Sequence, residues 1–288
     1  ILTAISSVKQ LETLKEKIPY FSRLCVEDNY LVLKDFLKIK ELWSDVEIIP
    51  ASDFILGIRS LKEKGEILLI KKAIKITEKA LEEVLPLIKV GISENDIAAE
   101  ITYRQKKMGA ESDSFPLQIL ASSHSALPHG RASERVVKKG DLLQFDIGAV
   151  YEGYHSDISR VALIGKREPT FPQQEVYETV LTIQKAMIEK IKPGVNFKEI
   201  HLEHKKLLKD AGFEVWHGLG HGVGLEIHEW PNLNMQDFIA KLGQVVTVEP
   251  GIYIPGWGGV RIEDMVLVIE TGHEILTSFP KDILVLDV

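Results

Sequence analysis

The spacing of apolar residues predicts two pairs of helices in this chain. Apolar residues recur at helical spacing over residues 67–84, and Pro86 should end that helix. A second helix opens with Ser93 and Asp96, which have the spacing of a capping box, and Gly109 is its expected C-cap. The first pair therefore reads as helix, short break, helix.

The same layout returns 103 residues later. Apolar positions of residues 176–191 form the third helix, which Pro193 and Gly194 should break, and the fourth helix follows. One constant offset relates Ser93, Asp96, Ile97 and Gly109 to Asn196, Glu199, Ile200 and Gly212. This offset indicates an internal duplication. We expect an α+β fold of two halves related by a pseudo-twofold axis, with helices packed on an antiparallel sheet and the site in the cleft between them.

The segment before these helices has a different organisation. Residues 1–57 read as alternating short helices and strands, with elements near Val8–Lys17, Tyr30–Phe36 and Val46–Ile49. This is too little for an α/β domain of usual size. We therefore predict a remnant or short form of an N-terminal α/β domain over residues 1–57 and the catalytic domain over 58–288.

A predicted hairpin places two carboxylates together in the first half. Residues 142–150 alternate, and Asp146 lies on one face of an otherwise apolar strand. Glu152–Gly153 makes a two-residue turn, so Asp157 should oppose Gly148 and share a face with Asp146. Diagonal neighbours of this kind lie roughly 7–8 Å apart, so the two carboxylates can converge on one ion. A solvated polar face is the alternative, but an unpaired charge in an apolar strand is costly.

The stretch richest in histidine and glycine is residues 216–230, WHGLGHGVGLEIHEW. Its histidines are His217, His221 and His228, and its alternating glycines allow close approach to a small polar target. A glycine loop with satisfied histidines is the alternative. Three histidines favour a metal or proton-transfer site. The spacing matches neither a nucleotide-binding glycine motif nor HExxH.

Two further acids follow in the second half. Glu249 ends a β-branched run, and Glu263 is expected in a strand with Arg261 on the same face. Exposed acids on an edge strand are the alternative reading. Together with Asp146, Asp157 and one histidine, these acids form an oxygen-rich set. Such a set suits a pair of Mn²⁺ or Co²⁺ ions, with Zn²⁺ or Fe²⁺ as alternatives. Two metals about 3.5–4 Å apart can hold a bridging hydroxide and polarise a carbonyl oxygen.

Composition narrows the setting without naming a function. The chain has 288 residues, of which 45% are hydrophobic, and a net charge of −7 without a basic block. We therefore expect a globular protein that does not bind nucleic acid. No apolar run reaches membrane-spanning length, so no membrane partner is expected. The single Cys25 and the lack of a signal peptide favour the cytoplasm.

Four motifs in order resemble one known family. ALPHGR, FDIGAVYEGYHSDISR, HGLGHGVGLEIHE and VEPGIYIPGWGGVRIED are similar to the proline-specific branch of the pita-bread metallopeptidases, which contains Xaa-Pro aminopeptidases and Xaa-Pro dipeptidases (prolidases). The resemblance covers residues 58–288, and more weakly the segment before them. It implies the pita-bread fold and hydrolysis of an Xaa-Pro bond, in dipeptides or at peptide N-termini, with two divalent metal ions.

The resemblance also implies roles for individual residues. Asp146 would bind one metal, Asp157 and Glu263 would bridge both, and His221 and Glu249 would complete the coordination of the second metal. Glu249 is expected to serve catalysis as well as metal binding.

Beside the metals, His129 and His228 would be catalytic, and His217, Arg261 and Tyr253 would bind the substrate. Tyr253 and Trp257 are candidate walls of a proline pocket, with core packing as an equal alternative.

Two departures and two rival functions remain. Ser159 stands where the family more often has threonine, so the hydroxyl is kept. Relatives carry a full α/β domain before the catalytic one, so the resemblance leaves a homodimer and the substrate length open.

A methionine-type aminopeptidase would share the five ligands, but GYHSD and GWGGVRIED resemble the proline branch. A non-enzymatic binding protein on the same fold would typically lose ligands, and here the set is intact.

Overall fold

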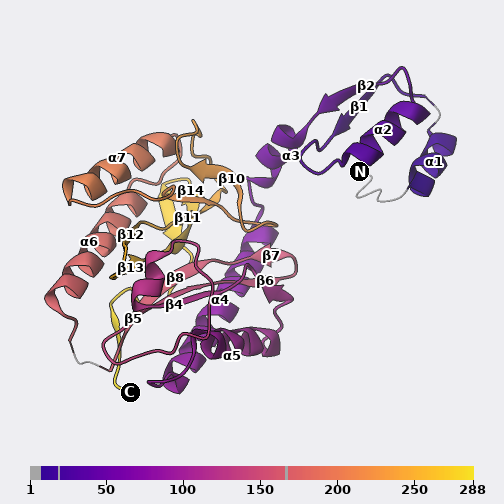
Figure 1. The fold of residues 1–288 in the computed structure, drawn as a ribbon. Helices are drawn as coiled ribbons and strands as arrows, with labels where there is room; N and C mark the ends of the chain where they lie inside the picture. The colour runs from indigo at the N-terminus through magenta and orange to yellow at the C-terminus, as the bar shows by residue number, and fades with distance from the viewer. Residues whose placement is uncertain (1–7, 19, 166–167) are drawn as a thin grey trace. The chain divides into compact units, whose positions relative to one another are not determined.

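The computed structural model describes residues 8–18, 20–165 and 168–288. Tertiary contacts divide the chain into two units, Ile1–Arg59 and Ser60–Val288. The main helices in the described residues are α1 (Val8–Lys17), α2 (Leu33–Leu42), α3 (Ser52–Arg59), α4 (Lys64–Val84), α5 (Glu94–Lys107), α6 (Phe171–Ile188) and α7 (Phe197–Asp210) (Figure 1).

The first unit pairs two short parallel strands with its helices. Strands β1 (Arg23–Val26) and β2 (Glu47–Pro50) run parallel, and a small core forms around Leu11, Ile39 and Trp43. The helix expected at Val8–Lys17 is confirmed. The element expected at Tyr30–Phe36 begins later, as α2. Strand β1 was not predicted, because three of its four residues are apolar in a row and give no polar–apolar alternation. That this unit is a short form of a larger domain remains an expectation.

The first half of the second unit places helices α4 and α5 on one sheet. The sheet has the order β16-β8-β5-β4, in which β16 alone runs parallel to its neighbour. Its strands are β4 (Gln118–Ala121), β5 (Leu142–Ile147), β8 (Ile158–Ile164) and β16 (Leu284–Leu286). Leu143, Phe145 and Ile147 face the core that α4 and α5 share. The opposite face of β5, which carries Asp146, is also buried, so the solvated-face alternative is wrong.

The predicted hairpin is confirmed. Strands β6 (Ala149–Tyr151) and β7 (Tyr154–His155) pair antiparallel around the two-residue turn, while β3 (Ser112–Asp113) borders β6 on its other side. The pairings Val150–His155 and Ile147–Ile158 have the same register on either side of Gly148 and Asp157. Asp157 therefore lies opposite Gly148, as the turn required.

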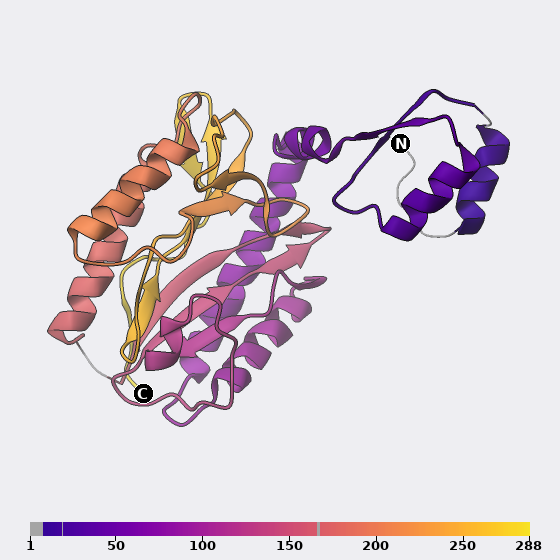
Figure 2. The same ribbon diagram turned by 45° about the horizontal axis from the view of Figure 1, so that its top comes forward.

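The second half builds a five-stranded antiparallel sheet in the order β10-β9-β11-β14-β15. Its strands are β9 (Gly220–Gly222), β10 (Glu229–Leu233), β11 (Val245–Val248), β14 (Asp264–Ile269) and β15 (Gly272–Ile275), with the hairpin β12 (Gly251–Ile254) and β13 (Gly258–Arg261) beside it. Helices α6 and α7 cover this half and also pack on Val161 and Leu163 of β8. Figures 1 and 2 show the strands between the two helix pairs, α4–α5 and α6–α7.

The duplication is visible in the hydrogen bonds that precede α5 and α7. Gly91 N donates to Val137 O over 2.8 Å, and Gly194 N donates to Ala240 O over 2.9 Å, at the same offset of 103 residues. The helix caps also agree, because Ser93 and Asn196 each accept a hydrogen bond from their own helix. The two halves share one backbone frame.

No helix in the described ranges is long and apolar enough to cross a membrane.

Candidate metal centre

The predicted site residues meet in one cavity. The cavity has a volume of about 370 Å³ and lies between the two halves of the second unit. Its lining includes every predicted site residue except Tyr253: His129, Asp146, Asp157, His217, His221, His228, Glu249, Arg261 and Glu263. Sequence reasoning missed Phe115, Gln118, Ile227 and Asn234, which also line it. Their only signal was proximity to motifs, since a phenylalanine or a glutamine carries no chemistry of its own.

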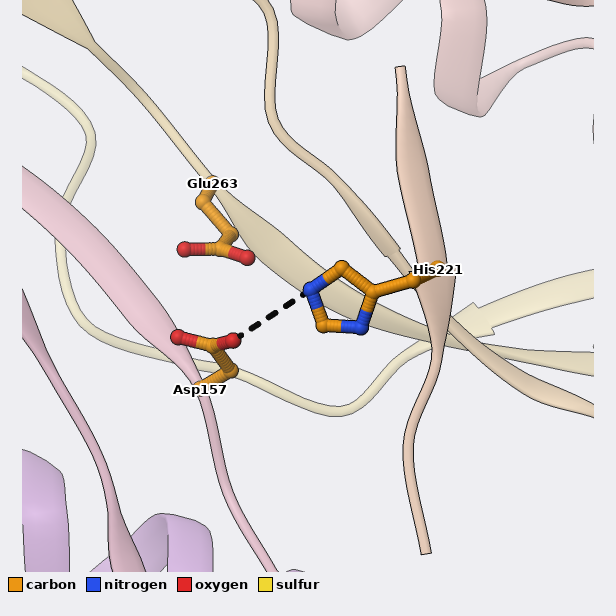
Figure 3. A group of neighbouring side chains, drawn as sticks. All are labelled: Asp157, His221 and Glu263. Atoms are coloured by element: carbon orange, nitrogen blue, oxygen red, sulfur yellow. Dashed lines mark ion pairs between the residues drawn. The ribbon is translucent and has the colours of Figure 1, made fainter. Parts of the chain in front are cut away.

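Three side chains at the floor of the cavity are arranged as metal ligands. Asp157, His221 and Glu263 each offer a ligand atom, and these atoms all lie within 4.8 Å of one another. In Figure 3 the two carboxylates and the imidazole point toward one common space, and the dashed line joins Asp157 to His221. His221 Nε2 lies 3.6 Å from Asp157 Oδ2 and 3.4 Å from Glu249 Oε1. Glu249 therefore borders the same space.

Two carboxylate oxygens in this group are buried without a partner in the part of the chain that the structure describes. Asp157 Oδ1 and Glu263 Oε1 are buried without a hydrogen bond to the described residues. Leaving a buried carboxylate oxygen unpaired costs several kcal/mol, unless a cation or proton compensates it. The donor set, with several carboxylates and one imidazole, fits divalent cations.

The pKa values of the buried acids also support a bound cation. Burial and the nearby Glu263 and Asp146 carboxylates raise the pKa of Asp157 well above its usual value. Burial, and to a smaller extent the charge of Glu249, likewise raises the pKa of Glu263. Burial raises the pKa of Glu249 to about 8. Without a cation Glu249 would hold a proton at neutral pH, and burial favours the protonated forms of Asp157 and Glu263 as well, so a bound cation would replace protons.

His221 is oriented to present one nitrogen to the acids. Its Nδ1–H donates to Gly222 O over 3.1 Å, which leaves Nε2 unprotonated toward the carboxylates. Burial, followed by the neighbouring His228, lowers the pKa of His221 to about 3, so the ring is neutral near pH 7. A neutral imidazole is the form that binds a metal.

Asp146, a predicted ligand, lies outside the group of three clustered ligands and has one carboxylate oxygen paired with an arginine. Its carboxylate makes a short ion pair with Arg261, whose side chain is almost fully buried. Arg261 Nε also donates to Ser159 Oγ over 3.0 Å, and Ser159 Oγ donates to Glu263 Oε2 over 2.9 Å. The hydroxyl at position 159 therefore links the arginine to a predicted bridging acid.

The expectation that Glu263 sits within a strand is wrong. Glu263 lies in the two-residue link between β13 and β14, two residues after Arg261, which ends β13. This link lets its carboxylate reach Ser159 while its own N–H donates to Ser159 O over 3.2 Å. Arg261 and Glu263 still point toward the same side, because both side chains contact the hydroxyl of Ser159.

The glycines around His221 serve strand packing. A Cβ at Gly220 would lie 2.1 Å from Thr247 O, and one at Gly222 would lie 2.3 Å from Trp230 O. Such contacts are too short for any side chain, so only glycine lets β9 lie between β10 and β11. The close approach that the sequence suggested is therefore to neighbouring backbone, and it is what places His221 at the floor.

The remaining histidines surround the acids. His228 stacks edge-on to His221 with ring centroids 4.2 Å apart, and burial with nearby His129 lowers its pKa. The next residue, Glu229, pairs with Lys62 over 2.6 Å in a fully buried ion pair. This pair fixes the backbone that carries His228. His129 reaches the cavity from the loop after β4.

Tyr253 lies behind the cavity wall. Its hydroxyl accepts from Arg261 Nη1 over 2.7 Å and donates to His217 Nε2, 2.9 Å away. Burial, and to a smaller extent the charge of Arg261, lowers the pKa of His217 to about 4. The ring is therefore neutral, and its Nε2 accepts the hydrogen bond from the Tyr253 hydroxyl. Trp257 packs against the core of the second half, which favours the core-packing alternative.

These features agree with comparisons to known proteins. Residues 69–270 match the model of metallopeptidase family M24. The chain belongs to this family, is a metal-dependent exopeptidase and has the pita-bread fold.

Individual relatives cover most of the chain. It is 42% identical over 259 residues to the Xaa-Pro dipeptidase of Pyrococcus furiosus, covering 89% of this chain and 73% of that protein. Among solved structures, the X-Pro aminopeptidase from Thermotoga maritima has a TM-score of 0.90 and 36% identity, covering 99% of this chain and 81% of that one. The Xaa-Pro dipeptidase from Bacillus anthracis has a TM-score of 0.91 and 37% identity, over 97% and 78% of the two chains.

Proposed function

We propose that this protein hydrolyses the Xaa-Pro bond of dipeptides or of peptide N-termini. The observation that carries the proposal is the cluster of Asp157, His221 and Glu263, with two buried carboxylate oxygens that have no hydrogen-bond partner among the described residues. The names of the relatives, Xaa-Pro dipeptidase and X-Pro aminopeptidase, support proline as the second residue.

Five side chains would hold two divalent ions: Asp146, Asp157, His221, Glu249 and Glu263. Their oxygen-rich character favours Mn²⁺ or Co²⁺, with Zn²⁺ or Fe²⁺ as alternatives. When bound, such ions supply an activated water at neutral pH and polarise the scissile carbonyl. For Asp146 to join the set, its carboxylate must share itself between a cation and Arg261, which an acid with two oxygens can do.

The protein's own groups would handle charge and protons. His228 is neutral near pH 7 because its pKa is lowered, so its ring N–H can donate a hydrogen bond to the carbonyl oxygen as negative charge develops there. His129 faces the same cavity and would donate toward the departing nitrogen. Glu249 borders the same space as the clustered ligands and, once a bound cation has displaced its proton, would accept the proton of the attacking water.

Specificity for proline follows from the missing N–H group of the Xaa-Pro peptide bond. An Xaa-Pro amide has no N–H, so a subsite that accepts a hydrogen bond from that group gains nothing. The site must hold the ring by shape, and Phe115, Pro116, Pro128 and Ile227 supply apolar surface in the cavity. His217 and Arg261 would bind polar parts of the peptide, with Tyr253 holding both in place.

A panel of matched peptides tests this function. We expect Ala-Pro and Leu-Pro peptides to be cleaved with Mn²⁺ or Co²⁺, and Ala-Ala and Leu-Ala peptides to have kcat/KM values lower by roughly 10²-fold or more. Chelation should abolish turnover, and re-addition of metal should restore it. A Met-Ala peptide serves as the control for a methionine-type aminopeptidase. Equal kcat/KM for proline and alanine would disprove proline specificity and leave the family assignment intact.

A homodimer and a cytoplasmic location belong to the same proposal. Light scattering of the purified protein tests the first. Cell fractionation tests the second, which rests on the single exposed Cys25 without a disulfide partner.

A further inference from the structure

A buried acid outside the cavity holds the loop that carries His129. Glu94 is the first residue of α5, and its side chain is completely buried. Its Oε1 accepts from Ala121 N over 2.7 Å, at the beginning of the loop. Its Oε2 accepts from Ser133 N over 3.1 Å and from Ser133 Oγ over 2.7 Å, at the end of the loop. His124 Nδ1 lies 2.8 Å from the same oxygen.

One carboxylate thus closes residues 121–133 from both ends. Between these ends, Pro128 O accepts from Arg261 Nη1 over 3.2 Å, directly before His129. Ser125 Oγ accepts from Gly259 N over 2.7 Å and fixes the first part of the loop on β13. Beyond His129, the next side-chain anchor in the described chain is Ser133, and its partner is Glu94. The position of the imidazole therefore depends on both Arg261 and Glu94.

The second half of the protein provides an internal control. Phe197 occupies the position 103 residues after Glu94 and is equally buried. The backbone frames agree, since Glu94 N donates to Arg135 O over 3.0 Å and Phe197 N donates to Phe238 O over 2.9 Å. An apolar side chain is therefore sufficient for packing at this position.

A buried carboxylate is more costly than a phenylalanine unless its hydrogen bonds are all made. In the first half, several donors meet Glu94, and the positive end of the α5 dipole favours its charge. Compared with Phe197, the carboxylate of Glu94 adds hydrogen bonds that fix both ends of the loop of residues 121–133.

We infer that Glu94 is a positioning residue for His129. The inference rests on the proposed function, in which His129 donates toward the leaving group. Glu94 contacts the ends of the loop, so it acts on the reaction through the placement of that imidazole. An error of about 1 Å in such a group can lower the rate by up to roughly 10²-fold.

The test uses the full chain and an isosteric change. In Glu94→Gln the amide NH₂ would face the donors at one of the two ends of the loop, so the loop loses an anchor while the volume is kept. We expect kcat for Ala-Pro to fall by about 10- to 100-fold, with KM within about threefold and two metal ions retained. Glu100→Gln, on the same helix and partly exposed, is the matched control and should keep wild-type kcat.

A double-mutant cycle separates positioning from general destabilisation. If Glu94 acts through His129, the variant Glu94→Gln/His129→Ala should be no slower than His129→Ala alone. Losses that multiply would overturn the inference, as would a Glu94→Gln variant with unchanged kcat. If Glu94→Gln fails to fold, Ser133→Ala removes one anchor and should lower kcat severalfold, and unchanged kcat in that variant overturns the inference.

Hydrogen exchange gives a readout that needs no turnover. Amides of residues 122–132 should exchange faster in Glu94→Gln than in the Glu100→Gln control, and equal exchange would overturn the inference. This measurement distinguishes the two proposals. Failure of the wild-type protein on every Xaa-Pro peptide would reject the proposed function, whereas the exchange experiment decides the role of Glu94 by itself.

Discussion

The two halves of the catalytic unit share a backbone frame but carry different chemistry. The first half provides Asp146 and Asp157, while the second half provides His221, Glu249 and Glu263. Asp146 and Glu249 are themselves 103 residues apart, so one carboxylate occupies the same position in each half. Neither half holds all five of the proposed metal ligands.

Other paired positions have diverged further. Glu94 in the first half corresponds to the apolar Phe197, and the buried Ile101 of the first half corresponds to His204. Both differences place a polar group in a core position of one half only. The comparison teaches that the repeated frame tolerates either type of side chain, so a polar residue at such a position needs its own explanation.

The largest effect should come from removing a ligand of either half. Asp157→Ala and Glu263→Ala should each lose metal, and each should lower kcat/KM by more than the roughly 10²–10³-fold cost of one transition-state donor. Metal analysis and turnover of Ala-Pro check this. Glu274→Ala, which removes an exposed partner of Lys71, is the control and should behave as wild type. A Glu263→Ala variant with two ions and normal turnover would show that Glu263 is no bridge.

The next effect compares histidines that the two halves contribute. His228→Ala should keep its metal, because its ring packs on His221 without being one of the three clustered ligands, and kcat should fall by roughly 10²–10³-fold. His129→Ala should behave similarly. Metal content and steady-state kinetics measure both. Loss of metal in His228→Ala would make this residue a ligand instead.

The smallest effect concerns stability alone. His204 is 1% exposed, and both of its ring nitrogens lack hydrogen-bond partners in the described residues. His204→Ile copies the first half and should raise the free energy of unfolding by about 1–3 kcal/mol at pH 7, since an unsatisfied buried group is removed. Ile101→His is the reciprocal change and should destabilise by a similar amount. Urea unfolding measures both, and an unchanged or lower stability of His204→Ile would contradict this reading.

The same variant should change the response to acid. Burial lowers the pKa of His204 to about 3, below its value of roughly 6.5 in an unfolded chain. Below about pH 6.5 the unfolded chain binds a proton on this ring that the folded state does not bind until near pH 3, so the free energy of unfolding of the wild type falls as the pH drops from 6.5 toward 3. The stability gained by His204→Ile over wild type should therefore grow between pH 7 and pH 4. A gain that is independent of pH would show that the ring does not titrate in this way.

Local chemistry determined much of this protein. Ser93 and Asp96 cap α5 as predicted, and Asn196 begins α7, because capping depends on neighbours within one turn. The turn at Glu152–Gly153 set the register that opposes Asp157 to Gly148, because a two-residue hairpin leaves one pairing. The offset of 103 residues then predicted two similar halves, and with them a site between the halves.

Tertiary structure decided the contacts between residues that are distant in the sequence. Arg261 was expected beside Glu263 on a strand, but it pairs with Asp146 and reaches Glu263 through Ser159. Tyr253 was expected at the substrate and lies behind the wall. Glu94 resembles any acid in a first helical turn until the chain returns, near Ala121 and Ser133, to meet it. No local pattern encodes such meetings, because the partner of a buried charge is chosen by the packing of whole elements.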